Sequence, residues 1–150
     1  MRIVVASDHG GFAYKAAIIK YLEDKGHECT DVGTFEEGSC HYPSFAIPAG
    51  ELVASGQADF GIVLCNTGIG ISIAANKVKG VRCAIGYSDE VVALTRRHND
   101  ANMLAFGAHF MRLEDILRRI DIFLEAPFEG GRHSTRVGII TDYEDKHYCK

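Results

Sequence analysis

The sequence predicts a single Rossmann-like α/β domain with three layers: a five-stranded parallel sheet and helices on both of its faces. Short runs of β-branched and other apolar residues alternate with longer amphipathic segments. Strands separated by helices form βαβ units, and right-handed crossovers place those helices on both faces of the sheet. The chain of 150 residues shows no linker, repeat or low-complexity tract, which suits one domain with its own core.

Five short apolar runs are expected to be strands, and they span residues 3–7, 27–32, 60–64, 82–86 and 103–106. The segments between and after them are expected to be helices, at residues 12–25, 43–55, 70–77, 89–97 and 113–124. Gly26 is a stop signal for the first helix, and Pro43 is a start signal for the second. Ser88 or Asp89 is the expected cap of the fourth. From Gly130 on the pattern is ambiguous, because residues 137–141 look strand-like by composition while a final helix fits equally well.

Composition excludes several classes of protein. The net charge is −4 and no basic stripe is present, which argues against a nucleic-acid partner. No apolar segment approaches the length of a membrane span, and the residues before Asp8 are too few for a signal peptide. No CxxC pair or cluster with metal-ligand spacing occurs, so we expect no bound metal, and free thiols in a reducing cytoplasm. The cysteines are Cys29, Cys40, Cys65, Cys83 and Cys149.

Polar residues follow the first and third predicted strands. Asp8 and His9 come after the first strand, and Cys65 and Thr67 end or follow the third. Ligands bind such sheets beyond the carboxyl ends of the strands, where the strand order reverses. If these two strands are neighbours across that point, the two segments face each other.

Cys65 stands just before a predicted helix, where a thiol carries more thiolate at neutral pH. A buried structural thiol is the alternative. Thr67, Gly68 and Gly70 are expected to form an oxyanion nest of backbone N–H groups, or Thr67 only caps the helix. The third glycine of a dinucleotide fingerprint is missing, so a dinucleotide site is disfavoured.

Two further segments are rich in polar side chains. Residues 98–102, His-Asn-Asp-Ala-Asn, form either a functional cluster or a simple turn. Arg132 and Arg136 would share one face of a helix, where two guanidinium groups suit a phosphate; a solvated face is the alternative.

Residues 7–11, 65–77, 98–102 and 130–133 resemble, in order, the motifs of the type B ribose-5-phosphate isomerases. That family includes the galactose-6-phosphate isomerase subunits. The resemblance spans nearly the whole chain and implies an aldose–ketose isomerase that works through a cis-enediol(ate), without a metal or an organic cofactor.

The resemblance also implies a role for each matching residue. Cys65 is the base that moves a proton between C1 and C2 of the sugar. Thr67 and the backbone of Gly68, Ile69 and Gly70 stabilise the enediolate oxygen.

A second set would open the sugar ring and hold the phosphate. His98, helped by Asp8, opens the furanose ring by acid/base transfer. Asn99 is a further substrate contact. The phosphate is held by His9, Arg132 and Arg136.

Two positions depart from the family's pattern. Asn66 stands where the family usually has Gly, and its side chain either narrows the pocket or adds a hydrogen bond to the sugar. His109 stands where an Arg that assists phosphate binding is common, so its positive charge depends on pH.

The predicted topology separates His98 from Cys65. His98 lies at the end of a helix antiparallel to the strands, and so near the opposite edge of the sheet. We therefore expect a homodimer, or a dimer of dimers, with sites shared between chains and the segment of about residues 130–150 packed across the interface. The family's dimers, with composite sites, agree.

Two other functions stay open. A hexose-6-phosphate isomerase, acting on allose or galactose 6-phosphate, would use the same residues. A non-catalytic sugar-phosphate-binding paralogue belongs to another class, and the presence of Cys65, Thr67 and His98 argues against it.

Overall fold

The computed structural model describes residues 1–148, and Cys149, which we expect in a frayed terminus, lies outside them. Five parallel strands form one sheet in the order β2-β1-β3-β5-β4. They are β1 (Arg2–Ser7), β2 (Glu28–Asp31), β3 (Phe60–Cys65), β4 (Cys83–Ile85) and β5 (Met103–Gly107). The predicted α/β fold class is confirmed.

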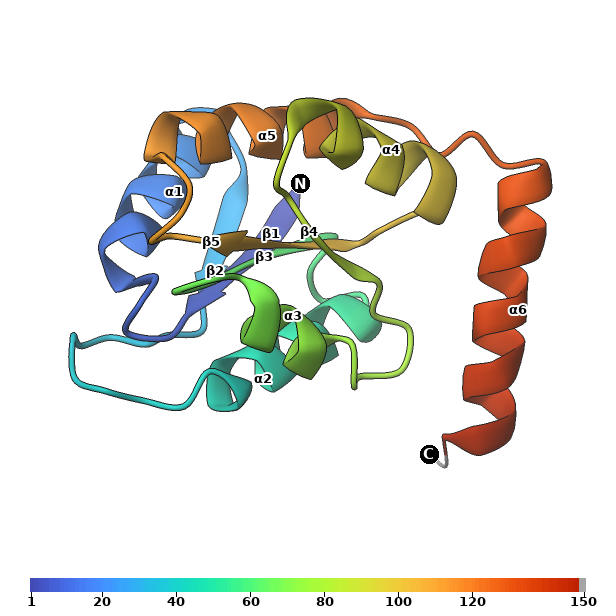
Figure 1. Cartoon of the computed structure of the whole chain (residues 1–150), viewed down its shortest axis with the longest axis horizontal. Coiled ribbons are helices and arrows are strands. Elements are labelled where there is room, and N and C mark those ends of the chain that lie inside the picture. The colour runs from blue at the N-terminus through green and yellow to red at the C-terminus, as the bar shows by residue number, and fades with distance from the viewer. Residues whose placement is uncertain (149–150) are drawn as a thin grey trace.

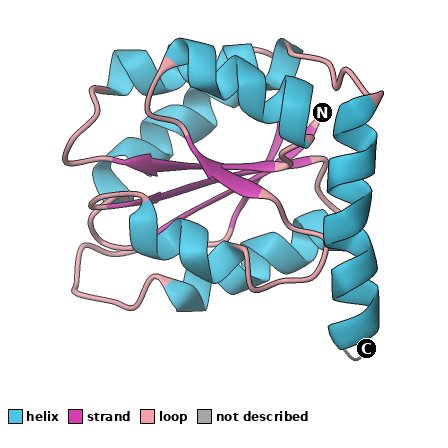
Figure 2. Cartoon of the chain, turned by 45° about the vertical axis from the view of Figure 1, so that its right-hand side comes forward, coloured by secondary structure: helices cyan, strands magenta, loops and turns pink. Residues whose placement is uncertain are grey.

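Helices cover both faces of the sheet, so the predicted three layers are confirmed (Figure 2). One face carries α1, α4 and α5, and the other carries α2 and α3. The bounds are α1 (Phe12–Asp24), α2 (Pro43–Ala54), α3 (Ile69–Ala75), α4 (Asp89–Asn99), α5 (Leu113–Glu125) and α6 (Arg132–His147).

The core lies in two layers because the sheet is buried on both sides. Along β1, Val4 and Ala6 pack toward α2 and α3, while Ile3 and Val5 pack toward α1 and α5. A strand covered on both faces needs apolar residues at every position, which explains why these strands read as continuous apolar runs.

The C-terminal segment is helical, so the strand alternative for residues 137–141 is wrong and the helix alternative is right. α6 stands at one end of the sheet, beside the end of α4 (Figure 1). Most of its side chains are exposed, including Ile139, Ile140 and Tyr143. Because the helix buries so little of its surface, its sequence carries no clear apolar pattern that would distinguish it from a strand. Only His133 is buried among the described residues of this helix.

α3 is shorter than predicted, ending at Ala75 rather than near residue 77. The Asn76 side chain explains this end, since its amide donates to the Cys83 carbonyl at 2.8 Å and accepts from the Cys83 N–H at 2.8 Å. Both bonds tie the chain to β4.

Across residues 1–148, no helix combines the length and apolar character needed to cross a bilayer.

Candidate active site

The sheet order reverses between β1 and β3, which lie side by side as expected. The segments that follow them are in close contact. Asp8 N–H donates to the carbonyl of Leu64 at 3.2 Å. A Cβ added at Gly10 would lie 2.8 Å from the backbone nitrogen of Asn66, so only glycine permits this approach. The segments after β1 and β3 therefore face each other, as predicted.

Asp8 and His9 are both held by neighbouring loops. Asp8 is buried, and its Oδ1 accepts from Gly10 N–H at 2.8 Å, so this carboxylate holds the loop that leads into α1. The exposed His9 accepts at Nδ1 from the Cys40 N–H at 3.2 Å. With Nδ1 used as an acceptor, the neutral ring carries its hydrogen on Nε2.

Cys65 ends β3 with its side chain buried and its sulfur hydrogen-bonded. The residue is 4% exposed, and Sγ accepts from Gly68 N–H at 3.1 Å. Gly68 adopts φ 80°, and a Cβ there would lie 2.9 Å from the carbonyl carbon of Phe106. The glycine thus lets the chain turn against β5 and aim an N–H group at the sulfur.

The turn after Cys65 is largely open to solvent. Asn66 and Thr67 are exposed, and Ile69 is 54% exposed. Thr67 Oγ1 accepts from Ile69 N–H at 3.2 Å, so its hydroxyl binds the first N–H group of α3, although the N-cap position itself is Gly68. Gly70 lies under the ring of Tyr42, where a Cβ would come within 2.8 Å.

The segment from residue 33 to Tyr42 borders this edge and is anchored by a cation that sequence reasoning missed. Lys15, 3% exposed, contacts both carboxylate oxygens of Asp31, at 2.5 and 2.6 Å. Asp31 Oδ1 also accepts from Gly33 N–H at 2.9 Å. The only indication in the sequence that Lys15 is buried is its helical spacing from Ile18 and Leu22, the other buried residues of α1.

His109 joins the same edge from β5. Its N–H donates to the Asn66 carbonyl at 3.1 Å, and its side chain is exposed. The structure thus brings together one set of predicted site residues, which we call the thiol cluster: Asp8, His9, Cys65, Asn66, Thr67, Gly68, Ile69, Gly70 and His109.

The other predicted residues form a second set at the opposite end of the sheet. His98 and Asn99 end α4, which leads into the amino end of β5. Arg132 and Arg136 are exposed and one turn apart on α6. Figure 1 shows α6 at one end of the molecule and the segment before α2 at the other. Within one chain, the structure does not bring these four residues to Cys65, nor His98 to Asp8.

His98 has two close neighbours that sequence reasoning did not assign. Its ring stacks on His133 with centroids 4.2 Å apart and planes 7° apart, and its Nε2 lies 3.5 Å from Oε2 of Glu129. The possible ligand atoms of His98, Glu129 and His133 lie within 4.8 Å of one another, close enough to share a metal ion. Parallel rings, however, aim their lone pairs along parallel planes, so this arrangement does not direct both at one ion.

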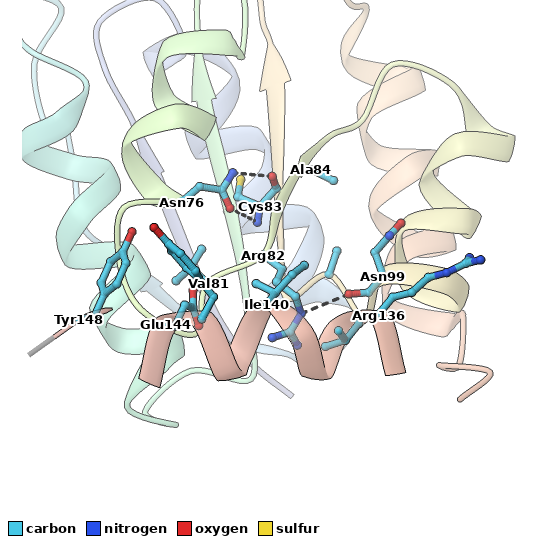
Figure 3. Close-up of a pocket in the computed structure, with 13 residues that line it drawn as sticks. Asn76, Val81, Arg82, Cys83, Ala84, Asn99, Arg136, Ile140, Glu144 and Tyr148 are labelled. Atoms are coloured by element: carbon cyan, nitrogen blue, oxygen red, sulfur yellow. Dashed lines mark hydrogen bonds between the residues drawn. The ribbon is translucent and has the colours of Figure 1, made fainter. Parts of the chain in front are cut away.

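A groove of about 460 Å³ separates α6 from the β4 edge (Figure 3). Asn99 and Arg136 line it together with Arg82 and Cys83, whereas Cys65 does not. Arg82 Nε donates to the carbonyls of Asn99 and Asp100, at 3.2 and 2.9 Å. Burial raises the pKa of the Cys83 thiol to about 12, so this sulfur stays protonated.

The fold and the thiol cluster define an α/β protein with a hydrogen-bonded thiol at the ligand edge of its sheet. The model of the Ribose/Galactose Isomerase family matches residues 3–140, and the chain belongs to this family. It is 41% identical to ribose-5-phosphate isomerase B of Escherichia coli, over 97% of each chain.

Solved structures agree with this assignment. Ribose-5-phosphate isomerase B of Clostridium thermocellum superposes with a TM-score of 0.96 at 46% identity, covering 98% of this chain and 99% of that one. The enzyme of Mycoplasma genitalium, solved with bound ribulose-5-phosphate, gives a TM-score of 0.94 at 38% identity over 97% of each chain.

Proposed function

We propose that this protein interconverts ribose 5-phosphate and ribulose 5-phosphate, with Cys65 as the base. One observation carries the proposal: in a chain of this family, a buried sulfur at the ligand edge accepts the Gly68 N–H at 3.1 Å. A relative named ribose-5-phosphate isomerase B holds ribulose-5-phosphate in its solved structure, which supports a sugar phosphate as the ligand.

The proposed reaction moves one carbon-bound proton. The Cys65 thiolate removes the proton from C2 of the open-chain aldose, and the electron pair moves to give an enediolate with charge on O1. Thr67 and the N–H groups at the start of α3 stabilise this oxygen. The same sulfur then returns the proton to C1. The O2 hydroxyl passes its proton to O1 in this step, so C2 becomes the ketone and O1 becomes a hydroxyl.

We propose a homodimer, or a dimer of dimers, with the site shared between chains. The separation of Cys65 from His98 within one chain supports this, because a second chain is needed to join the thiol cluster to Arg132 and Arg136. Exposed apolar side chains on α6, such as Ile139 and Tyr143, suit burial against a partner. The segment from about residue 130 would then pack across the interface.

Mixing two inactive variants tests the shared site. If Cys65→Ala and His98→Ala chains are unfolded together and refolded as dimers, half of the dimers are mixed, and each holds one intact site. Activity should return to about a quarter of that of the unmodified protein. No recovery would mean that both residues act within one chain. The molar mass in solution, by light scattering, gives the oligomer independently.

A coupled assay with Cys65→Ala tests the enzyme assignment. We expect ribose 5-phosphate turnover to fall by at least about 10²-fold, the usual worth of a general base, while binding of the sugar phosphate persists. Cys83→Ala is the matched control. Turnover that survives in Cys65→Ala would mean that the base is another residue, and an unmodified protein that only binds would favour a non-catalytic paralogue.

A hexose-6-phosphate isomerase is the second candidate, because the family model itself spans ribose and galactose isomerases. Comparing ribose 5-phosphate with allose and galactose 6-phosphates in the same assay separates the two.

We also propose a cytoplasmic location, since the described cysteines are free thiols, which suit a reducing compartment.

A further inference from the structure

His133 is a buried polar side chain on an otherwise exposed helix. It is 5% exposed, and burial removes its imidazole from water at a cost that an apolar side chain would not carry. The motif that contains it, residues 130–133, leaves it without a role in the proposed reaction. Its position therefore requires another explanation.

Its neighbours give that explanation. The His133 ring lies flat on the His98 ring, at 4.2 Å between centroids. Oε2 of Glu129 lies 3.5 Å from Nε2 of His98 and 3.9 Å from Nε2 of His133. Glu129 is itself fixed to α4, because Arg97 Nε donates to its Oε1 at 2.6 Å and its own N–H donates to the Arg97 carbonyl at 3.0 Å.

The two groups around His98 are a neutral ring and a carboxylate. Burial, and then the positive charges of His98, Arg132 and Arg136, lower the pKa of His133, so this ring is neutral near pH 7. Arg97 lowers the pKa of Glu129, which stays ionised. A protonated His98 ring would thus lie on a neutral aromatic face and beside a carboxylate, and both contacts stabilise a cation.

We infer that His133 and Glu129 are positioning residues for His98: they fix its ring and stabilise the proton it carries while the sugar ring opens. The inference rests on the proposed function. In ring opening the C1–O4 bond breaks, O4 gains a proton and the O1 hydroxyl loses one. Ribulose 5-phosphate needs no such step, because its phosphate blocks O5, the oxygen that would close a furanose ring on C2.

This difference between the two sugars separates positioning from general support of the fold. Conversion of ribose 5-phosphate requires ring opening, whereas exchange of the C1 hydrogen of ribulose 5-phosphate with deuterated water requires only Cys65. We expect His133→Ala to slow the first reaction at least tenfold, as a small displacement of an acid/base group does. The exchange, followed by NMR, should stay within about twofold.

Matched variants complete the test. His133→Phe restores a flat ring over His98 and should recover most of the lost rate, and Glu129→Gln should slow ring opening with exchange intact. His147→Ala, which removes a ring that contacts Tyr143 on the same helix, should change neither reaction. Retained exchange also shows that each variant is folded.

Equal losses in both reactions, or no loss in either, would overturn the inference. Failure of the proposed function looks different. The unmodified protein would then convert neither sugar phosphate, or the Cys65→Ala variant would exchange the C1 hydrogen as fast as the unmodified protein.

Discussion

The backbone N–H of His109 donates to the backbone carbonyl of Asn66 at 3.1 Å, and this bond joins the turn after β5 to the turn after β3. These are the two positions where the sequence departs from the family's pattern. Both side chains are exposed at the thiol cluster. Residues in contact usually couple rather than act independently, so we expect a double variant to differ from the sum of the single variants.

His109→Arg should make phosphate binding less dependent on pH. An imidazole beside a phosphate loses its positive charge as the pH rises through neutrality, whereas a guanidinium keeps its charge. The KM for ribose 5-phosphate should rise several-fold between pH 6 and 8.5 in the unmodified protein and much less in the variant. Steady-state kinetics across this range provide the check, and two parallel profiles would show that His109 does not contact the phosphate.

Asn66→Gly should shift the choice of sugar. Asn66 is not among the described residues with positive φ, so glycine is not needed there for the backbone and the variant should fold. If its side chain narrows the pocket, kcat/KM for allose 6-phosphate relative to ribose 5-phosphate should rise by up to about tenfold, the worth of room for one more carbon. A ratio that stays constant would assign Asn66 no part in sugar length.

Local pattern predicted much of this molecule, and long-range contacts decided the rest. Five strands and five helices follow from apolar periods and end signals, and the facing of Asp8 and Cys65 follows from topology. The buried Lys15–Asp31 pair, the Asn76 bonds that end α3 and the His98–His133 stack join separate elements. The apolar pattern within one segment cannot predict such contacts, because each depends on how the helices and strands pack together.

Gly68→Ala should be far more destabilising than Gly26→Ala. Both glycines have positive φ, 80° and 83°, so each alanine carries the left-handed cost of about 1–2 kcal/mol. Only at Gly68 would the new Cβ also meet backbone, 2.9 Å from Phe106, while Gly26 has no atom within 4 Å. Urea unfolding should show a loss of about 3 kcal/mol or more at Gly68. Equal losses would mean that the close approach to β5 is relaxed at little cost.

Alkylation should inactivate the enzyme through Cys65. Burial raises the pKa of Cys29 to about 11 and that of Cys83 to about 12, so both remain unreactive thiols near pH 8. Iodoacetamide inactivation should follow modification of Cys65 in peptide mass spectra, and ribulose 5-phosphate should slow it. Cys40→Ser serves as the control and should inactivate at the unmodified rate; protection from inactivation in that variant would point to Cys40 instead.

Mild acid should reduce the free energy of unfolding, in part through His27. Burial, the amino terminus and Lys25 lower the pKa of His27, and its buried Nδ1 has no hydrogen-bond partner within the described residues. Below about pH 6.5 the unfolded chain takes up a proton that the folded chain refuses, so stability is fully present above this pH and falls as the pH decreases. Urea unfolding between pH 7.5 and 5 should therefore show a smaller decline for His27→Gln than for the unmodified protein, while His41→Gln, at an exposed position, should leave the decline unchanged. Identical slopes for all three proteins would show that His27 is protonated equally in the folded and unfolded states.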